Sequence, residues 1–275
     1  MKYTPKELEG NVNITPVPPV REFFVLIGGL LAILILTYAA LGIVVDQLVD
    51  RMPQKMDSLL GAVFSEKFSD KDRSDGELKL QKMLDDLLEK YPDMGSAYTV
   101  HIVESETVNA VAMPGGNIII FSQLLKEIES ENELAFILSH ELGHFANRDH
   151  LRGLGRGLLL IALSTIIMGH DSAATDFLMN SLVTAETKFS QSQESAADAF
   201  ALEMLSSRYG HISGAGDFFK RMNERDKTGK LLYYFASHPH PEDRVKALDK
   251  LVNERGYSRG EKRGVDEKLV PLGKE

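Results

Sequence analysis

The longest apolar stretch of the chain runs from Phe23 to Val45 and is interrupted only by small residues, Thr37 and Tyr38. A stretch of about 23 residues is long enough to cross a bilayer as a helix. It follows a polar arm, residues 1–22, whereas a cleaved signal peptide has a shorter apolar region nearer the N-terminus. The sequence therefore predicts one uncleaved transmembrane anchor, residues 23–45.

Positive charges flank this stretch unequally. Lys2, Lys6 and Arg21 precede it, and Arg51 and Lys55 follow closely. Because positive residues are enriched on the cytoplasmic side of a membrane, the excess favours an N-terminus inside the cell. In a bacterium, this orientation would give a single-pass protein of the inner membrane whose residues from 46 onward face the periplasm.

Beyond the anchor, helical apolar spacing alternates with short β-forming segments. Helical spacing covers residues 53–68, 76–91, 187–206, 214–223 and 241–254, and the β-forming segments are 98–103, 108–113 and 117–121. The last two segments flank Pro114-Gly115-Gly116, which predicts a hairpin. We expect an α+β domain over residues 46–255, mainly helical with a small antiparallel sheet, and a flexible C-terminal tail over residues 256–275.

A second apolar stretch, Leu158–Met168, contains Ser164 and Thr165. It is too short to cross a bilayer comfortably. We interpret it as a buried or membrane-grazing helix rather than as a second anchor.

Composition limits the partners and the metal ligands. The net charge of -9, with no basic stripe, argues against a nucleic-acid partner. The chain has no cysteine, so it has no disulfide, and a bound metal must be held by histidines and carboxylates. The length of 275 residues and the hydrophobic content of 43% accommodate one catalytic domain with appendages.

The sequence His140-Glu141-Leu142-Gly143-His144 lies in an apolar run. Ser130 and Glu133 form a capping box ahead of it, which predicts a helix over residues 131–147. Residues four apart share one helix face, so both imidazoles can bind one zinc ion per chain while Glu141 acts as the general base toward water. This pattern is typical of zinc hydrolases.

A catalytic zinc site needs a third protein ligand, and the sequence offers two candidates. His150 has the metzincin spacing, but Asn147 replaces the glycine of that pattern and no convincing Met-turn follows. Glu194 is favoured because it shares a helix face with Asp198, and the small residues between them allow a close approach to the motif helix. Asp198 would then accept a hydrogen bond from a ligand imidazole, His144 or its neighbour.

Four separated segments of the chain form a further pattern: Asn109 to Gly116, Ser139 to His144, Glu194 to Ala199 and His238 to Arg244. Together these segments resemble peptidase family M48, a family of zinc metallopeptidases. The resemblance covers residues 52–252 and implies a zincin-like metalloprotease domain. It also implies that His140, His144 and Glu194 bind zinc and that Glu141 is the base.

The resemblance adds residues that the zinc motif does not contain. It places His238 beside the metal, as an oxyanion stabiliser or an inhibitory fourth ligand, and His240 is an alternative because both flank a proline. Arg244 completes the same segment and is a further candidate. The strand and turn next to the active site would bind substrate through Asn109, Met113, Pro114, Gly115 and Gly116.

The single predicted anchor distinguishes the chain from prenyl-protein proteases of the family, which enclose substrate between several spans. The chain more closely resembles single-anchor or soluble, envelope-facing bacterial members. Because an extended peptide can pair with an exposed strand, we expect protein or peptide substrates and endopeptidase activity in quality control of unfolded or misassembled envelope proteins. A membrane-tethered chaperone or adaptor with little proteolysis and a small-molecule amidohydrolase are the alternatives.

Overall fold

The computed structural model describes residues 18–65, 73–94, 98–169, 172, 173, 175–177, 189–225, 238, 241–266 and 269. The chain forms two compact units, residues 1–44 and 45–275. The described part of the first unit consists of most of helix α1 (Pro19–Arg51), whose last turns belong to the second. Two described helices are long and apolar enough to cross a membrane, α1 and α6 (Asp149–Met168).

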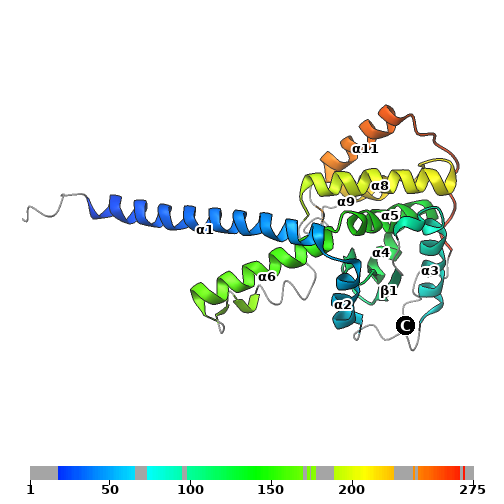
Figure 1. Ribbon diagram of the computed structural model, residues 1–275. Helices are drawn as coiled ribbons and strands as arrows, with labels where there is room; N and C mark the ends of the chain where they lie inside the picture. Colours follow the sequence, from blue (N-terminus) through cyan, green and yellow to red (C-terminus); the bar gives the residue numbers. More distant parts are fainter. Residues whose placement is uncertain are drawn as a thin grey trace, which may run out of the picture. The chain divides into compact units, whose positions relative to one another are not determined.

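The second unit combines helices with one small sheet (Figure 1). Its further helices are α2 (Gln54–Ser65), α3 (Asp75–Leu88), η2 (Pro92–Met94), α4 (Ser122–Glu127), α5 (Glu131–Ala146), α8 (Gln191–Tyr209), α9 (Asp217–Arg225) and α11 (Pro241–Arg255). Its strands are β1 (Thr99–Val103), β2 (Ala110–Met113) and β3 (Asn117–Phe121). The predicted fold class, α+β and mainly helical, is confirmed.

The sheet has the order β1-β3-β2 and is mixed, which corrects the prediction of an antiparallel sheet. Strands β2 and β3 form the predicted antiparallel hairpin, and its turn contains Gly115 and Gly116, at φ of 80° and 79°. Such angles favour glycine. Strand β1 pairs with the other edge of β3 in parallel. The chain reverses once between β1 and β2 and again in the hairpin, so β1 and β3 point the same way.

Helix α5 lies in the centre of the second unit, between the sheet and α8 (Figure 1). Because both of its sides are covered, α5 is buried from Asn132 to Phe145. The N-cap prediction is half confirmed: Ser130 Oγ accepts a hydrogen bond from Glu133 N, but the Glu133 carboxylate accepts one from Glu129 N instead of closing the box. The core around α5 includes Leu80, Leu84, Ile118, Ile120, Leu134, Ile137, Leu138, Leu202 and Leu205.

The segment after α11 is held against the domain. Arg263 O accepts a hydrogen bond from Glu131 N at 2.9 Å, and Arg263 N donates to Asn132 Oδ1 at 2.8 Å. Ser258 O accepts another from Ile212 N at 3.0 Å. Residues 258 and 263 of the predicted flexible tail thus bond to the domain, and the flexibility of the tail stays a prediction; residues 267, 268 and 270–275 lie outside the described part.

Candidate metal centre

Two closely packed helices, α5 and α8, carry most of the site. A Cβ atom added to Gly143 of α5 would lie 2.8 Å from Cα of Ala197 in α8, closer than atoms can approach. Only the missing side chain permits this separation. The close approach expected from the small residues of α8 is thus present, and it brings Glu194 opposite His140 and His144.

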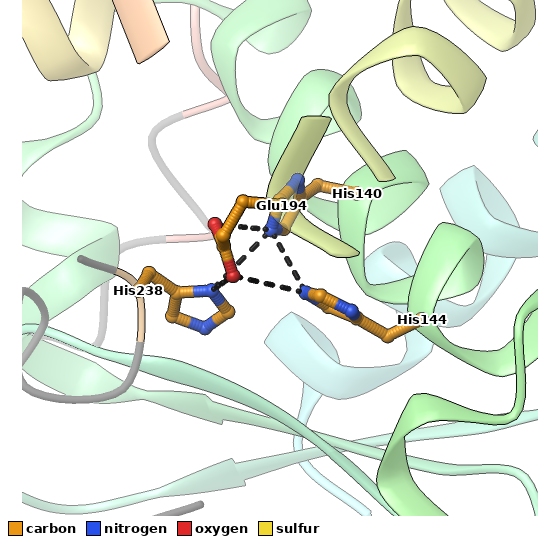
Figure 2. A group of neighbouring side chains, drawn as sticks. All are labelled: His140, His144, Glu194 and His238. Carbon is orange, nitrogen blue, oxygen red and sulfur yellow. Dashed lines mark hydrogen bonds and ion pairs between the residues drawn. The ribbon is translucent and has the colours of Figure 1, made fainter. Parts of the chain in front are cut away.

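Four buried side chains converge at this helix pair (Figure 2). One potential ligand atom from each of His140, His144, Glu194 and His238 lies within 4.8 Å of the others, and all four residues are fully buried. His140 Nε2 lies 3.1 Å from His144 Nε2 and 3.5 Å from Glu194 Oε2. His238 Nδ1 lies 3.4 Å from His140 Nε2 and 2.9 Å from Glu194 Oε1.

These separations fit a tetrahedral zinc site. Ligand atoms about 2.0–2.1 Å from a tetrahedral zinc ion are about 3.3–3.4 Å from one another. Three imidazole nitrogens and one carboxylate are also a donor set that zinc prefers. The residues present therefore fit the predicted ion, and His238 Nδ1 lies where it could act as the fourth ligand.

Glu141 lies beside this cluster without joining it. Its carboxylate is fully buried, and neither oxygen has a hydrogen-bond partner among the residues that the structure describes. Its Oε1 lies 3.8 Å from His238 Nε2. A buried carboxylate without a hydrogen bond is costly, and its oxygens can accept a proton from an entering water.

Each motif imidazole is oriented by its own carboxylate. His140 Nδ1 lies 3.0 Å from Asp198 Oδ1, and His144 Nδ1 lies 3.0 Å from Asp149 Oδ2. Asp198, expected beside His144 or its neighbour, lies beside His140. The role of Asp149 was not predicted from the sequence, although it is an acidic residue only five positions after His144. Such partners fix the ring orientation so that each Nε2 faces the metal.

Arg244 joins the carboxylates behind the metal cluster. Its guanidinium donates to both oxygens of Asp198, at 2.6 and 3.0 Å, and its Nη1 lies 2.8 Å from Glu194 Oε2. The same group lies 4.1 Å from the centre of the Phe219 ring. Arg244, a further candidate on sequence grounds, thus lies at the site and holds two acidic side chains in place.

The charges of the cluster are strongly coupled. Burial alone would raise the pKa of Glu194, but its electrostatic interactions with His238 and Arg244 hold that pKa far below its usual range. Burial and Arg244 lower the pKa of His140. Burial opposes charge on His144 too, yet hydrogen bonds to Asp149 and Glu194 raise its pKa to about 9. Without metal, the site therefore favours a proton on His144.

Other candidate residues lie elsewhere. His150 does not reach the cluster: its Nε2 lies 3.3 Å from Asp57 Oδ2 in α2, which removes it as the third ligand. His240 lies outside the described residues.

The predicted substrate-binding turn contacts α2. Asp57 Oδ1 accepts a hydrogen bond from Gly115 N at 2.8 Å, and a Cβ atom on Gly61 would lie 2.3 Å from Cα of Gly115. Pro114 O accepts a hydrogen bond from the Asn117 side chain. Asn109 O, just before β2, accepts a hydrogen bond from Phe121 N, while Met113 ends the strand and is 7% exposed.

In the described chain β2 is an edge strand, and it packs against α5. An edge strand can accept an extended peptide. Its side chains are buried, however, with Val111 and Ala112 only 6% and 5% exposed. Substrate binding there stays a prediction.

The fold and the metal cluster define a zinc metallopeptidase domain. The chain belongs to peptidase family M48, whose model matches residues 75–252, and this confirms the resemblance seen in the sequence. The family is zinc-dependent, in agreement with the predicted cofactor. The matched range contains every residue of the metal cluster and begins after α1 and α2.

Three relatives each match more than half of the chain. "Metalloendopeptidase OMA1, mitochondrial" of Danio rerio is 28% identical over 171 residues, which is 57% of this chain and 36% of that protein. The putative beta-barrel assembly-enhancing protease of Vibrio cholerae is 26% identical over 56% of this chain and 34% of its own length. Metalloprotease YcaL of Escherichia coli is 26% identical over 56% of this chain and 62% of its own length.

Proposed function

We propose that this chain is a membrane-anchored zinc endopeptidase that hydrolyses peptide bonds in unfolded or misassembled envelope proteins. The observation that carries this proposal is the buried cluster of His140, His144, Glu194 and His238, with the Glu141 carboxylate beside it, which accepts no hydrogen bond from the described residues. The names of the relatives support peptidase activity. Two of these relatives are bacterial, and the Vibrio cholerae protein is named for enhancing β-barrel assembly.

The residues divide the chemistry between them. A zinc ion held by His140, His144 and Glu194 would polarise the scissile carbonyl and make a water more acidic. Glu141 would take the proton from the attacking water and deliver it to the leaving amine. Asp149 and Asp198 would keep the imidazoles in their ligating orientation.

His238 would cap the metal at rest. Its Nδ1 fills the fourth corner of the cluster, which a catalytic site must leave open for water. The side chain would therefore have to swing aside during turnover, and its Nε2 already faces Glu141 at 3.8 Å. Replacement His238→Ala separates the two proposed roles: turnover rises if His238 is mainly a cap and falls if it mainly stabilises the oxyanion.

Proteins and peptides are the substrates we propose. The edge strand β2 packs on the helix that carries the metal ligands, so a peptide added to that edge would run past the metal centre. Backbone pairing selects extended chains more than particular sequences. We infer broad specificity for polypeptides that are unfolded.

We also propose that α1 anchors the protein, with residues 1–22 as a polar arm and the peptidase domain in residues 46–255. The helix has 33 residues, more than the ~20 that cross a bilayer. The positive charges around it and the bacterial relatives support a single span in the inner membrane with the domain in the periplasm.

Replacement of Glu141 by glutamine tests the mechanism. The full-length Glu141→Gln variant should lose casein digestion by about 10²–10⁴-fold while it retains zinc, because Glu141 is not a ligand. Digestion by the unaltered protein should stop with a chelator and return with zinc. Glu203→Gln, at an exposed position of α8, is the matched control and should keep both properties.

Two results would count against this proposal. Near-normal digestion by Glu141→Gln would remove Glu141 as the base. Chelator-insensitive binding of unfolded casein without any digestion would favour the chaperone or adaptor instead.

A further inference from the structure

We propose that α6 is a second membrane-contacting element, which dips from Gly157 onward into the acyl chains of one leaflet without crossing the bilayer. Its partner is the lipid itself. This inference rests on one part of the proposed function, the α1 anchor, because the anchor places a bilayer beside the domain.

The apolar side chains of α6 are exposed over its second half. Leu158 is 51% exposed, Ile166 79% and Ile167 58%. At about 100° per residue, Leu160 points roughly opposite to Leu158, and it too is exposed. A helix that is apolar on more than one face suits surrounding acyl chains better than a single flat protein partner.

A charged cluster marks where this apolar half begins. Arg156 Nη2 lies 2.6 Å from Asp46 Oδ2, and Arg152 pairs with Asp50. The apolar stretch of α1 ends directly before Asp46, and that of α6 starts directly after Arg156. Both stretches therefore adjoin the same group of charges, as expected if that group lies among the lipid headgroups.

The hydroxyl groups beyond this point have partners within the same segment. Thr165 Oγ1 donates to Ile161 O at 2.9 Å, and Ser164 Oγ lies 2.8 Å from Thr175 Oγ1. Thr175 Oγ1 in turn lies 3.1 Å from Gly169 O and the residue is 3% exposed. Internal satisfaction of polar groups is what a segment among acyl chains requires, since lipid offers no hydrogen bonds.

The length of the uncharged segment limits its depth. Gly157–Met168 rises about 18 Å, at about 1.5 Å per residue, whereas the hydrocarbon core is about 30 Å thick. The exposed Asp176 follows shortly afterwards, and a carboxylate near the bilayer centre is unfavourable. A shallow dip keeps Asp176 near the headgroups and leaves the apolar side chains in lipid.

This placement would bring the metal centre close to the membrane surface. Helix α6 begins at Asp149, whose carboxylate lies 3.0 Å from His144 Nδ1. The domain would then be held at two points, by α1 and by α6, and would act on polypeptides at the bilayer surface.

Local fluorescence tests the contact without interference from the anchor. Because the chain has no cysteine, single variants Ile166→Cys and Ile167→Cys can carry one nitrobenzoxadiazole label in the full-length protein. The proteins are reconstituted in phosphatidylcholine and phosphatidylglycerol vesicles that contain nitroxide lipids, with the nitroxide near the headgroup or near the chain end. Leu31→Cys in α1 and Leu78→Cys in α3, both 52% exposed, are matched controls.

We expect strong quenching at Ile166 and Ile167 by the headgroup-proximal nitroxide, stronger quenching at Leu31 by the chain-end nitroxide, and none at Leu78. Labels at Ile166 and Ile167 that are as unquenched as the label at Leu78 would overturn the proposal. Labels that are shielded from iodide but not quenched by the nitroxide lipids would also overturn it, because they would be covered by a second copy of the chain or by another protein. Stronger quenching by the chain-end lipid at Ile166 would overturn the shallow placement.

The two proposals fail separately in this experiment. Quenching at Leu31 without quenching at Ile166 leaves the anchor intact and removes the α6 contact. Quenching at Ile166 without quenching at Leu31 supports the α6 contact and removes the anchor.

Discussion

Helices α5 and α6 follow each other in the chain and are both rich in apolar residues, yet their surroundings are opposite. Helix α5 is buried from Asn132 to Phe145, whereas α6 exposes Leu158, Ile166 and Ile167. The two helices differ in where their polar residues lie and in what these residues contact. In α5 the two motif histidines have carboxylate partners on other elements, whereas α6 carries its charges in the first two turns and none from Gly157 to Met168. Apolar content alone therefore does not reveal what surrounds a helix.

The largest effect should come from matched truncations in the two helices. Phe136→Ala in α5 should lower the free energy of unfolding by about 3–5 kcal/mol, because the ring is 2% exposed and contacts Phe219. Ile166→Ala in α6 should change it by less than about 0.5 kcal/mol in detergent. Denaturant unfolding of both purified variants makes the measurement, and equal losses would refute the contrast between the helices.

A smaller effect should follow from filling the contact between α5 and α8. Gly143→Ala places a methyl group 2.8 Å from Ala197 Cα and must push the helices apart. We expect a loss of about 1–3 kcal/mol in the free energy of unfolding, together with lower zinc content, because Glu194 moves with α8. Gly28→Ala in α1 has no neighbour within 4 Å and is the control. Unchanged zinc content in Gly143→Ala would show that the helix spacing does not set the site.

The sequence predicted the parts of this site that depend on local spacing. His140, Glu141 and His144 repeat within one helix, and Glu194 and Asp198 repeat within another, so helix geometry alone groups them. Asp149, the partner of His144, was not predicted because it belongs to the next helix, beyond the turn at Arg148. Helical spacing relates only residues within the same helix. Arg148 has a φ of 56°, and that left-handed turn brings Asp149 back to His144.

The fold shows the same limit. Hairpin β2–β3 was predictable from Pro114-Gly115-Gly116, because the turn chemistry is local. The parallel pairing of β1 with β3 depends on which edge of β3 is left free by β2. The residues of β1 and of its neighbouring turns do not determine which edge that is. Likewise, residues 257–266 look like a polar tail, but the backbone of Arg263 and of Ser258 accepts hydrogen bonds from Glu131 and Ile212, which are distant in the sequence.

Asp149 links the two helices and gives the next prediction. Asp149→Asn should weaken zinc binding by about 10–100-fold, because His144 loses a charged partner at 3.0 Å. Competition with a fluorescent zinc chelator measures the affinity. Asp176→Asn, at an exposed position after α6, should leave it unchanged. Similar weakening in both variants would indicate a general charge effect instead of orientation of His144.

The smallest effect is the dependence of zinc affinity on pH, which follows from the pair His144 and Asp149. In the metal-free site the pKa of His144 is raised to about 9, so below that pH zinc must displace a proton from this ring. Glu194 and Asp198 have lowered pKa values and are already ionised, and the pKa of His140 is lowered as well.

One displaced proton makes the apparent zinc affinity rise by about tenfold per pH unit between neutrality and about pH 9. Calorimetry in buffers of different ionisation enthalpy counts the released proton. Asp149→Asn should reduce this release near neutral pH, since the hydrogen bond that favours the charged imidazole is weakened. If the affinity of the unaltered protein is flat over this range, His144 is already neutral, and α6 does not govern its protonation through Asp149.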